Sequence, residues 1–131
     1  MELVKVLLDS CVLLWWWSEP DRLSPRVTSL IKDSSNAIYV SAATAWEIAT
    51  KHRIGKLPGA ARVIEEWDQR VSLDRFTEVP VTSSHAFRAG TLPGSHRDPF
   101  NRMLAAQGIM ENAPILTPDA NFESLGAQRI W

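Results

Sequence analysis

The sequence predicts an α/β protein, with a three-layer α/β/α arrangement around a central parallel sheet of four to five strands. Short aliphatic runs typical of buried strands alternate along the chain with segments of helical spacing, and such alternation connects parallel neighbours. The 131 residues, of which 45% are hydrophobic, suffice for one packed core. We therefore expect residues 1–131 to form a single domain.

The chain opens with one predicted strand and two helices. Residues 4–9, VKVLLD, form an aliphatic run that ends in an acid, which is typical of a buried strand. Residues 11–20 then predict a short helix that a proline stops. Over residues 23–33, Ser24 is placed to cap a helix and Pro25 to occupy its first position.

The middle of the chain repeats the strand-then-helix pattern. Residues 36–41 predict a second strand, and residues 41–57 predict a helix with Ser41 as its cap. Trp46 and three alanines keep helical spacing within that segment. Residues 60–71 predict one further helix, because four apolar side chains recur on one side of it.

The last part of the chain adds three strands and two helices. In the order strand, helix, helix, strand, strand, they are expected over residues 76–81, 82–92, 98–112, 114–119 and 128–131. Pro80 favours the end of a strand or an edge of the sheet. Asp98 and Pro99 are typical of a helix N-terminus, as cap and first residue.

Composition narrows the class of protein. The formal net charge is −1, which neither indicates nor excludes a nucleic-acid binder, because a local groove matters more than the total. Cys11 is the only cysteine, so a reducing, cytoplasmic setting without an internal disulfide is expected. We expect no membrane span, since no apolar run reaches about 20 residues, and no signal peptide, since the N-terminal segment lacks a basic leader.

Acidic and amide side chains follow the predicted strands. Asp9 ends the first strand, Asp119 ends the fourth, and Glu47 lies early in the helix after the second. Asp98 and Asn101 open the helix that precedes the fourth strand. Because the working site of such sheets lies beyond the carboxyl ends of the strands, we expect all five side chains to meet there.

Carboxylates that converge in a partly dry cleft repel one another unless a cation neutralises them. Oxygen ligands favour a hard cation, Mg²⁺ or Mn²⁺, and such an ion suits hydrolysis of a phosphodiester. Asp98 and Asp119 also have purely structural explanations, as a helix cap and as a turn residue. The three histidines, at positions 52, 85 and 96, are expected to be structural or on the surface.

Four blocks resemble the PIN-domain ribonucleases, and among them the VapC-type toxins of bacterial toxin–antitoxin pairs. In chain order they are LLDSCVLLWW, YVSAATAWEIATKHRIGKL, HRDPFNRMLAAQ and ILTPD. The resemblance implies a PIN-like fold and a metal-dependent endoribonuclease that acts as the toxin of a type II pair. It also implies RNA as substrate, a homodimer and a cognate antitoxin protein.

The resemblance assigns roles position by position. Asp9, Glu47, Asp98 and Asp119 match the family's catalytic acids, which hold the metal. Ser10 and Thr117 match hydroxyls beside the first and last acids, which we expect to contact substrate. Two positions depart from the pattern. Asn101 stands for the usual aspartate and is kept as a metal-site residue with one negative charge fewer, and Cys11, where the family often has histidine, is read as a small buried hydrophobe.

Basic and aromatic residues near these blocks are candidates for contacts with other molecules. Phosphate contacts are expected from Lys51, Arg53, Arg97 and Arg102, with solvated surface charge as the alternative. The consecutive residues 15–17 are all tryptophan, and at least one is expected to be exposed unless a partner covers it.

The sequence bears on two alternative functions. A receiver-like or phosphotransferase domain lacks support, since it needs a late lysine and no lysine follows Lys56. A catalytically weakened PIN fold that binds RNA or a protein partner stays open, because Asn101 removes one charge from the site.

Overall fold

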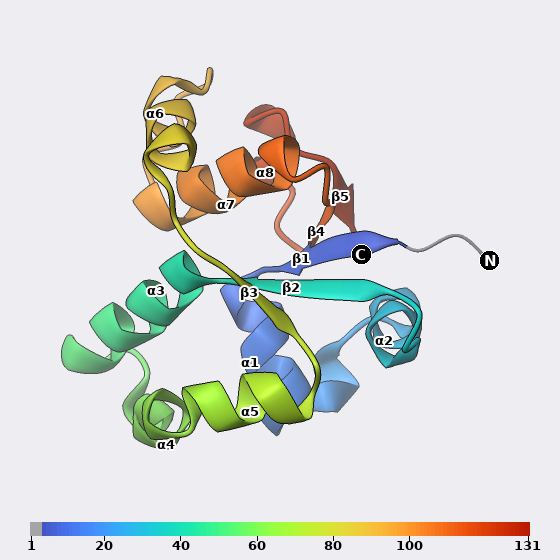
Figure 1. The fold of residues 1–131 in the computed structure, drawn as a ribbon. Helices are drawn as coiled ribbons and strands as arrows, with labels where there is room; N and C mark the ends of the chain where they lie inside the picture. Colours follow the sequence, from blue (N-terminus) through green and yellow to red (C-terminus); the bar gives the residue numbers. More distant parts are fainter. Residues whose placement is uncertain (1–3) are drawn as a thin grey trace.

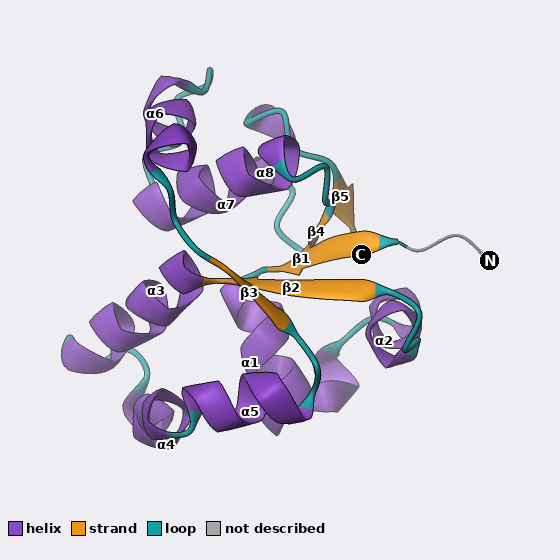
Figure 2. Cartoon of the chain, in the orientation of Figure 1, coloured by secondary structure: helices purple, strands orange, loops and turns teal. Residues whose placement is uncertain are grey.

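Five parallel strands form the central sheet of the computed structural model, which describes residues 4–131 (Figures 1 and 2). The order of strands across the sheet is β3-β2-β1-β4-β5. Their bounds are β1 Lys5–Leu8, β2 Ala37–Ser41, β3 Thr77–Val79, β4 Ile115–Leu116 and β5 Arg129–Ile130. The chain thus starts at the centre of the sheet and builds outward, first to β3 and then to β5.

Eight α-helices connect the strands within the described part of the chain. Their bounds are α1 Ser10–Ser18, α2 Pro25–Lys32, α3 Ala42–Arg53, α4 Ala61–Glu65, α5 Trp67–Leu73, α6 Ser83–Thr91, α7 Pro99–Met110 and α8 Asn121–Ser124. Short 3₁₀ turns at Pro20–Arg22 and Pro58–Ala60 precede α2 and α4. Helices α1, α2 and α5 lie on one face of the sheet, and α6, α7 and α8 on the other (Figure 1). The predicted three-layer α/β/α fold is therefore confirmed.

The alternation of side chains along β1 explains the two layers. Val6 and Leu8 are buried in a core shared with α1, α2 and α5. Leu7, on the opposite side of the same strand, is buried in a second core with α6, α7 and α8. A strand that is apolar on both sides must be covered on both sides, which is why Val6, Leu7 and Leu8 of the central strand are consecutive aliphatic residues.

Three predicted helix caps are confirmed. The Ser24 hydroxyl accepts a hydrogen bond from the backbone N–H of Val27 at the start of α2. Ser41 caps α3, and Asp98 caps α7 with Pro99 in its first position. These residues fix where α3 and α7 begin, and both helices begin at the carboxyl end of the sheet.

The predictions for the middle of the chain were partly wrong. Residues 60–71 do not form one helix, because the chain bends at Glu66 between α4 and α5. The bend lets Val71 pack under the sheet while Ile64 lines a pocket against α3. Trp46 follows the helical spacing yet lies on the outer face of α3, 60% exposed.

The strands are shorter than the aliphatic runs that predict them. The run at 114–119 contributes only Ile115 and Leu116 to the sheet, since the next residues turn away to place Asp119. Strand β3 ends at Val79, so Pro80 lies just past the end of an edge strand, as its missing N–H requires.

The prediction that one of the consecutive tryptophans is exposed was wrong, since all three are half-buried. Each finds a different aromatic neighbour: Trp15 packs edge-on against Trp131, Trp16 against Phe76 and Trp17 against Trp67. The indole N–H groups of Trp16 and Trp17 both donate to Asp74. Three segments of the chain itself therefore cover part of these tryptophans, where the sequence led us to expect exposure or an external partner.

None of the helices described over residues 4–131 has the length and apolar character needed to cross a membrane.

Candidate active site

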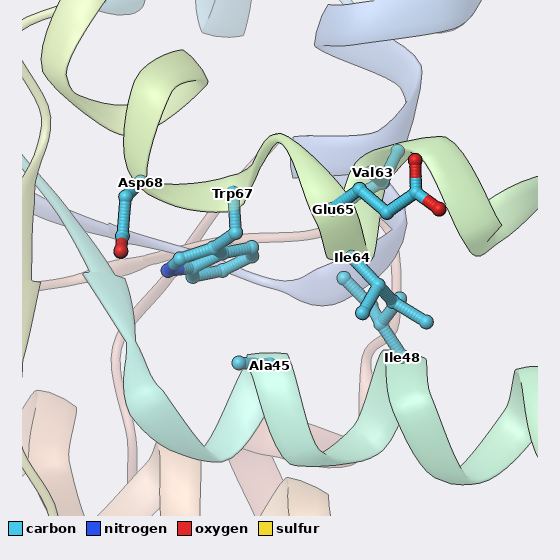
Figure 3. A pocket seen from close by; sticks show the side chains of 7 residues that line it. All are labelled: Ala45, Ile48, Val63, Ile64, Glu65, Trp67 and Asp68. Atoms are coloured by element: carbon cyan, nitrogen blue, oxygen red, sulfur yellow. The ribbon is translucent and has the colours of Figure 1, made fainter.

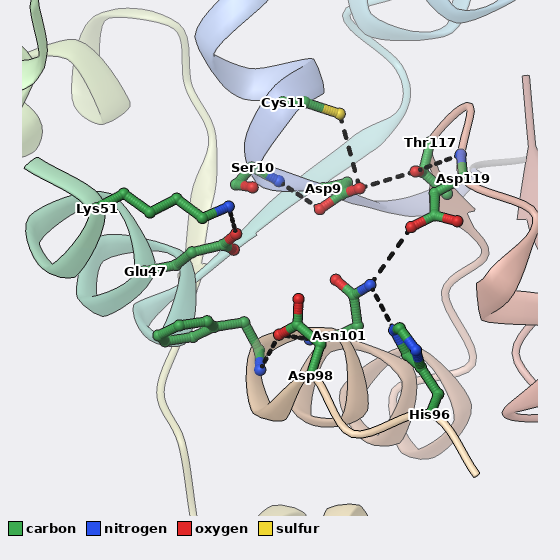
Figure 4. A network of polar contacts seen from close by, with 11 residues as sticks. Asp9, Ser10, Cys11, Glu47, Lys51, His96, Asp98, Asn101, Thr117 and Asp119 are labelled. Carbon is green, nitrogen blue, oxygen red and sulfur yellow. Dashed lines mark hydrogen bonds and ion pairs between the residues drawn. The ribbon is translucent and has the colours of Figure 1, made fainter. Parts of the chain in front are cut away.

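Five polar side chains from separate segments point toward one space at the carboxyl end of the sheet (Figure 4). Asp9 directly follows β1, Glu47 lies on α3, and Asp119 lies in the turn after β4. Asp98 and Asn101 belong to the cap and first turn of α7. The parallel sheet brings them together because the carboxyl ends of all its strands face the same way. Their roles as ligands or catalysts stay predictions.

Asp9 lies at the centre of the group and is 6% exposed. Its carboxylate accepts hydrogen bonds from the Ser10 backbone N–H at 2.7 Å and the Thr117 hydroxyl at 2.8 Å. Burial raises the pKa of Asp9 above its ordinary value, and the charge of Glu47 raises it further, although the hydrogen bonds oppose this change. Holding this carboxylate ionised therefore requires positive charge nearby.

Thr117 holds two of the acids in place. Its hydroxyl donates to Asp9 and accepts the backbone N–H of Asp119 at 3.0 Å. The side chain is 0% exposed, and both hydrogen bonds are to residues of the site. Thr117 therefore positions Asp9 and Asp119, and its expected contact with substrate stays a prediction.

Glu47 is buried at 3% exposure on the inner side of α3. One oxygen, Oε2, bonds the Lys51 ammonium at 2.5 Å, whereas Oε1 is buried without a hydrogen-bond partner among the described residues. Burial lowers the pKa of Lys51, but the hydrogen bond and charge of Glu47, with the charges of Asp98 and Asp9, raise it overall. Lys51 is thus an ammonium within the acidic group, where the sequence had placed a phosphate contact.

The first turn of α7 brings two more site residues. Asp98 Oδ1 accepts the backbone N–H groups of Phe100 and Asn101, which confirms the capping role. The amide nitrogen of Asn101 donates to Asp119 at 3.4 Å and to Nε2 of His96 at 2.9 Å. His96 therefore supports the site, which sequence reasoning missed; its place two residues before Asp98 was the available signal.

The basic residues divide into two groups. Arg102 was expected to contact phosphate, but each of its three guanidinium nitrogens donates to a backbone carbonyl, at Ala89, Leu92 or His96. The side chain thus ties the loop before Asp98 to the end of α6, and the expected phosphate contact of Arg102 stays a prediction. Arg53 and Arg97 are exposed and free of such a structural role in the described contacts.

A buried polar contact sets the distance between α3 and α7. The Ser41 hydroxyl donates to Gln107 Oε1 at 2.5 Å and accepts the backbone N–H of Ala43. The Gln107 amide also donates to the carbonyl of Pro80 at the end of β3. Because Ser41 caps the helix that carries Glu47, this contact fixes Glu47 relative to the acids of α7.

Cys11 differs from the small buried hydrophobe that was expected. The side chain is half-buried, and its thiol donates to Asp9 Oδ2 at 3.7 Å. Burial raises the pKa of the Cys11 thiol to about 12, with the charge of Asp9 adding to the effect. The thiol is therefore a protonated donor to the central carboxylate.

Pockets adjoin the acidic group on its apolar side. One of 170 Å³ lies between α1 and α3 and includes Ser10, Glu47 and Lys51 in its lining. It shares Leu14, Trp15 and Leu57 with a larger pocket of 430 Å³ that extends to α4. A separate pocket of 300 Å³ lies between α3 and the α4–α5 bend, lined mainly by apolar side chains (Figure 3).

The donor set fits a hard divalent cation. It consists of carboxylate oxygens and one amide oxygen, and the unpartnered Oε1 of Glu47 is buried where a cation would satisfy it. Within residues 4–131, no three Asp, Glu, His or Cys side chains are grouped closely enough to hold one ion as they stand. The acids are instead engaged by Lys51, Thr117 and backbone N–H groups.

Comparison with known proteins agrees with the fold. The family model described as "PIN domain" matches residues 6–128. The chain belongs to the PIN-domain family. This PIN domain is 32% identical to Ribonuclease VapC22 of Mycobacterium tuberculosis over 120 residues, which cover 91% of this chain and 90% of that protein. The resemblance found in the four sequence blocks is confirmed.

Solved structures share the fold of this PIN domain. VapBC2 from Rickettsia felis, bound to a DNA fragment from the promoter, matches with a TM-score of 0.71 and 18% identity over 97% of this chain and 98% of that one. FitAcB from Neisseria gonorrhoeae matches with a TM-score of 0.65 and 20% identity over 96% of each chain.

Proposed function

We propose that the protein is a metal-dependent endoribonuclease and the toxin of a type II toxin–antitoxin pair. One observation supports this most: two buried carboxylates, Asp9 and Glu47, face each other at the carboxyl end of the sheet, and one oxygen of Glu47 has no partner. Burying two acids side by side is unfavourable, and such a group is retained where a cation or a reaction uses it. The relationship to Ribonuclease VapC22 favours RNA as the substrate.

Different residues of the chain would hold the metal ion and orient its ligands. Asp9, Glu47, Asp98 and Asp119, with the Asn101 carbonyl oxygen, surround the space that would hold Mg²⁺ or Mn²⁺. A bound divalent cation supplies activation of water and neutralisation of phosphate charge. Thr117 and Cys11 orient Asp9 through hydrogen bonds, and Asn101 orients Asp119.

The substrate would enter along the exposed rim of the acidic group. Arg53 and Arg97 are exposed, on α3 and directly before Asp98, and are placed to contact phosphate groups. Ser10 lines the small pocket next to Glu47 and can contact the substrate there. Single-stranded or looped RNA fits this arrangement better than a uniform duplex, because a flexible strand can bend into the site.

Two protein partners belong to the proposal. The two adjoining pockets along α1 would receive an apolar segment of a cognate antitoxin, because they lead from Lys51 toward α4 and are lined by Leu14, Trp15 and Leu57. Exposed aromatic side chains, Trp46 and Phe87, support a homodimer. The structural neighbours include the VapBC2 and FitAcB assemblies. The single cysteine fits action in the reducing cytoplasm.

A nuclease assay tests the proposal. Wild type, Asp9→Asn and Asp21→Asn, an exposed aspartate as matched control, are incubated with an RNA pool in Mn²⁺ or in EDTA. We expect cleavage by wild type and Asp21→Asn in Mn²⁺ alone, and at least a roughly hundredfold loss in Asp9→Asn. Cleavage that resists EDTA, or that is equal in Asp9→Asn, would overturn the proposed mechanism.

A second function is favoured by Asn101. Its amide donates to Asp119, where the family's usual carboxylate would add charge, so the site is less negative than the family pattern. A PIN fold of this kind could be kept for binding RNA or a protein partner. Wild type that binds RNA without cutting any in Mn²⁺ would support that function and exclude the nuclease.

A further inference from the structure

The ion pair between Lys51 and Glu47 joins a partly exposed cation to a buried acid. The Lys51 side chain is 39% exposed and that of Glu47 is 4% exposed, and their charged atoms lie 2.5 Å apart. The two residues are four apart on α3, so the regular geometry of the helix places the ammonium beside the carboxylate. The pair is therefore built into one rigid element.

Lys51 also senses the other acids of the site. The charges of Asp98 and Asp9, beside that of Glu47, act on the ammonium and favour its charged form. Its chain lines the small pocket together with Ser10, Cys11 and Glu47. Figure 4 shows the ammonium turned toward Glu47 and the acidic group.

The acidic group needs positive charge whether or not a metal ion is bound. Ionised carboxylates in a site of low water content repel one another, and unpaired burial of each is unfavourable. Backbone N–H groups satisfy Asp98, and Thr117 satisfies part of Asp9. Glu47 receives its hydrogen bond from Lys51.

We propose that Lys51 is a tethered counter-cation that neutralises Glu47 through Oε2 in the metal-free protein and competes for the charge of Glu47 with a divalent ion bound at the free Oε1. This inference rests on the proposed metal-dependent function and adds a residue that opposes metal loading. Lys51 stabilises the unloaded site and weakens metal binding by competition. A phosphate anchor, the role expected from sequence, would do neither.

Metal binding measured by calorimetry tests the inference without any nuclease assay. Wild type, Lys51→Met and Lys51→Arg are titrated with MnCl₂, with Lys56→Met as control because it removes the same charge from an exposed position on the segment after α3. We expect Lys51→Met to bind Mn²⁺ roughly three- to tenfold more tightly than wild type, after allowing for the partial exposure of the pair. Lys51→Arg should stay close to wild type, and Lys56→Met within about twofold.

Melting in EDTA gives a second readout of opposite sign. Without metal, Lys51→Met should melt about 3 °C below wild type, because Glu47 loses its hydrogen-bonded cation. Saturating Mn²⁺ should then raise the melting temperature of Lys51→Met by more than that of wild type.

Each outcome of these measurements supports or overturns the proposed role of Lys51. Equal or weaker Mn²⁺ binding by Lys51→Met, or an equal gain in Lys56→Met, overturns the role of Lys51 and leaves the proposed nuclease standing. Mn²⁺ binding by Lys51→Met alone supports the competition. Absence of Mn²⁺ binding in every variant overturns both the metal site and this inference, whereas loss of RNA cleavage with unchanged Mn²⁺ binding identifies Lys51 as a substrate contact.

Discussion

The acidic group has an inner and an outer half, and the two are stabilised differently. The inner acids, Asp9 and Glu47, are buried beside the end of β1 and on the inner side of α3. The outer acids, Asp98 and Asp119, are half-buried and lie in a helix cap and a turn. Backbone N–H groups a few residues ahead bond both outer acids.

This difference distinguishes acids that are stabilised by the backbone of their own segment from acids that depend on other side chains. A cap or turn aspartate is satisfied by its own neighbours and would be stable in a protein with no catalytic site. Asp9 accepts the backbone N–H of Ser10 but also needs Thr117 from another segment. No backbone N–H among the described hydrogen bonds reaches the carboxylate of Glu47; Lys51 bonds one of its oxygens, and the other, Oε1, is buried without a partner among the described residues. The requirement for a cation is therefore concentrated on the inner half of the site.

Removing the charge of one acid from each half should change the Mn²⁺ affinity most, and it tests whether the inner acids contribute more to metal binding than the outer acids. We expect Glu47→Gln to weaken Mn²⁺ binding about a hundredfold and Asp98→Asn about tenfold, because the inner charge is less screened by water. Asparagine caps a helix as well as aspartate does, so Asp98→Asn should keep its melting temperature in EDTA. Calorimetric titration with MnCl₂ measures both, and the reverse order of losses would contradict the division.

The pH dependence of the free energy of unfolding, measured without metal, tests whether Asp9 is a buried acid of the inner half. The pKa of Asp9 is raised above its ordinary value of 3.8, so the folded state binds more protons than the unfolded state between those two values. The free energy of unfolding contributed by Asp9 is thus highest below pH 3.8 and falls as pH rises to the folded pKa. Its limiting slope is about 1.4 kcal/mol per pH unit.

Urea unfolding in EDTA at a series of pH values checks this expectation. The slope should be present in wild type and reduced in Asp9→Asn, which carries no titrating group at this position. Asp98→Asn serves as the outer control, since its carboxylate is half-buried and bonded by backbone N–H groups. Equal pH slopes in wild type and Asp9→Asn would show that Asp9 is not the buried acid described.

Restoring the family's aspartate at position 101 should change the Mn²⁺ affinity less than removing either acid does. Asn101→Asp replaces a donor to Asp119 and His96 with a charge that repels Asp119. We expect Mn²⁺ to bind about threefold more tightly and the melting temperature in EDTA to fall by about 2 °C. Differential scanning fluorimetry with and without MnCl₂ reads both, and a loss of Mn²⁺ affinity would mean that the Asn101 amide itself is needed.

Local patterns predicted most of the fold. The consecutive aliphatic residues 6–8 of β1 require cover on both faces, and the caps Ser24, Ser41 and Asp98 are determined by residues within one helical turn. The bend at Glu66 and the outward-facing Trp46 were missed, because spacing identifies a helical face without saying which neighbour it meets.

The order of the acids along the chain, each after a strand or in the early part of a helix, is visible in local sequence patterns. How their charges are balanced depends on the folded protein. Lys51, Thr117 and Arg102 each looked like a contact for substrate, yet they bond a buried acid, two site residues and a loop. The i, i+4 spacing of Glu47 and Lys51 is visible in the sequence, but the burial of Glu47 and the partners of Thr117 and Arg102 depend on segments far apart in the chain, which no pattern within one segment records.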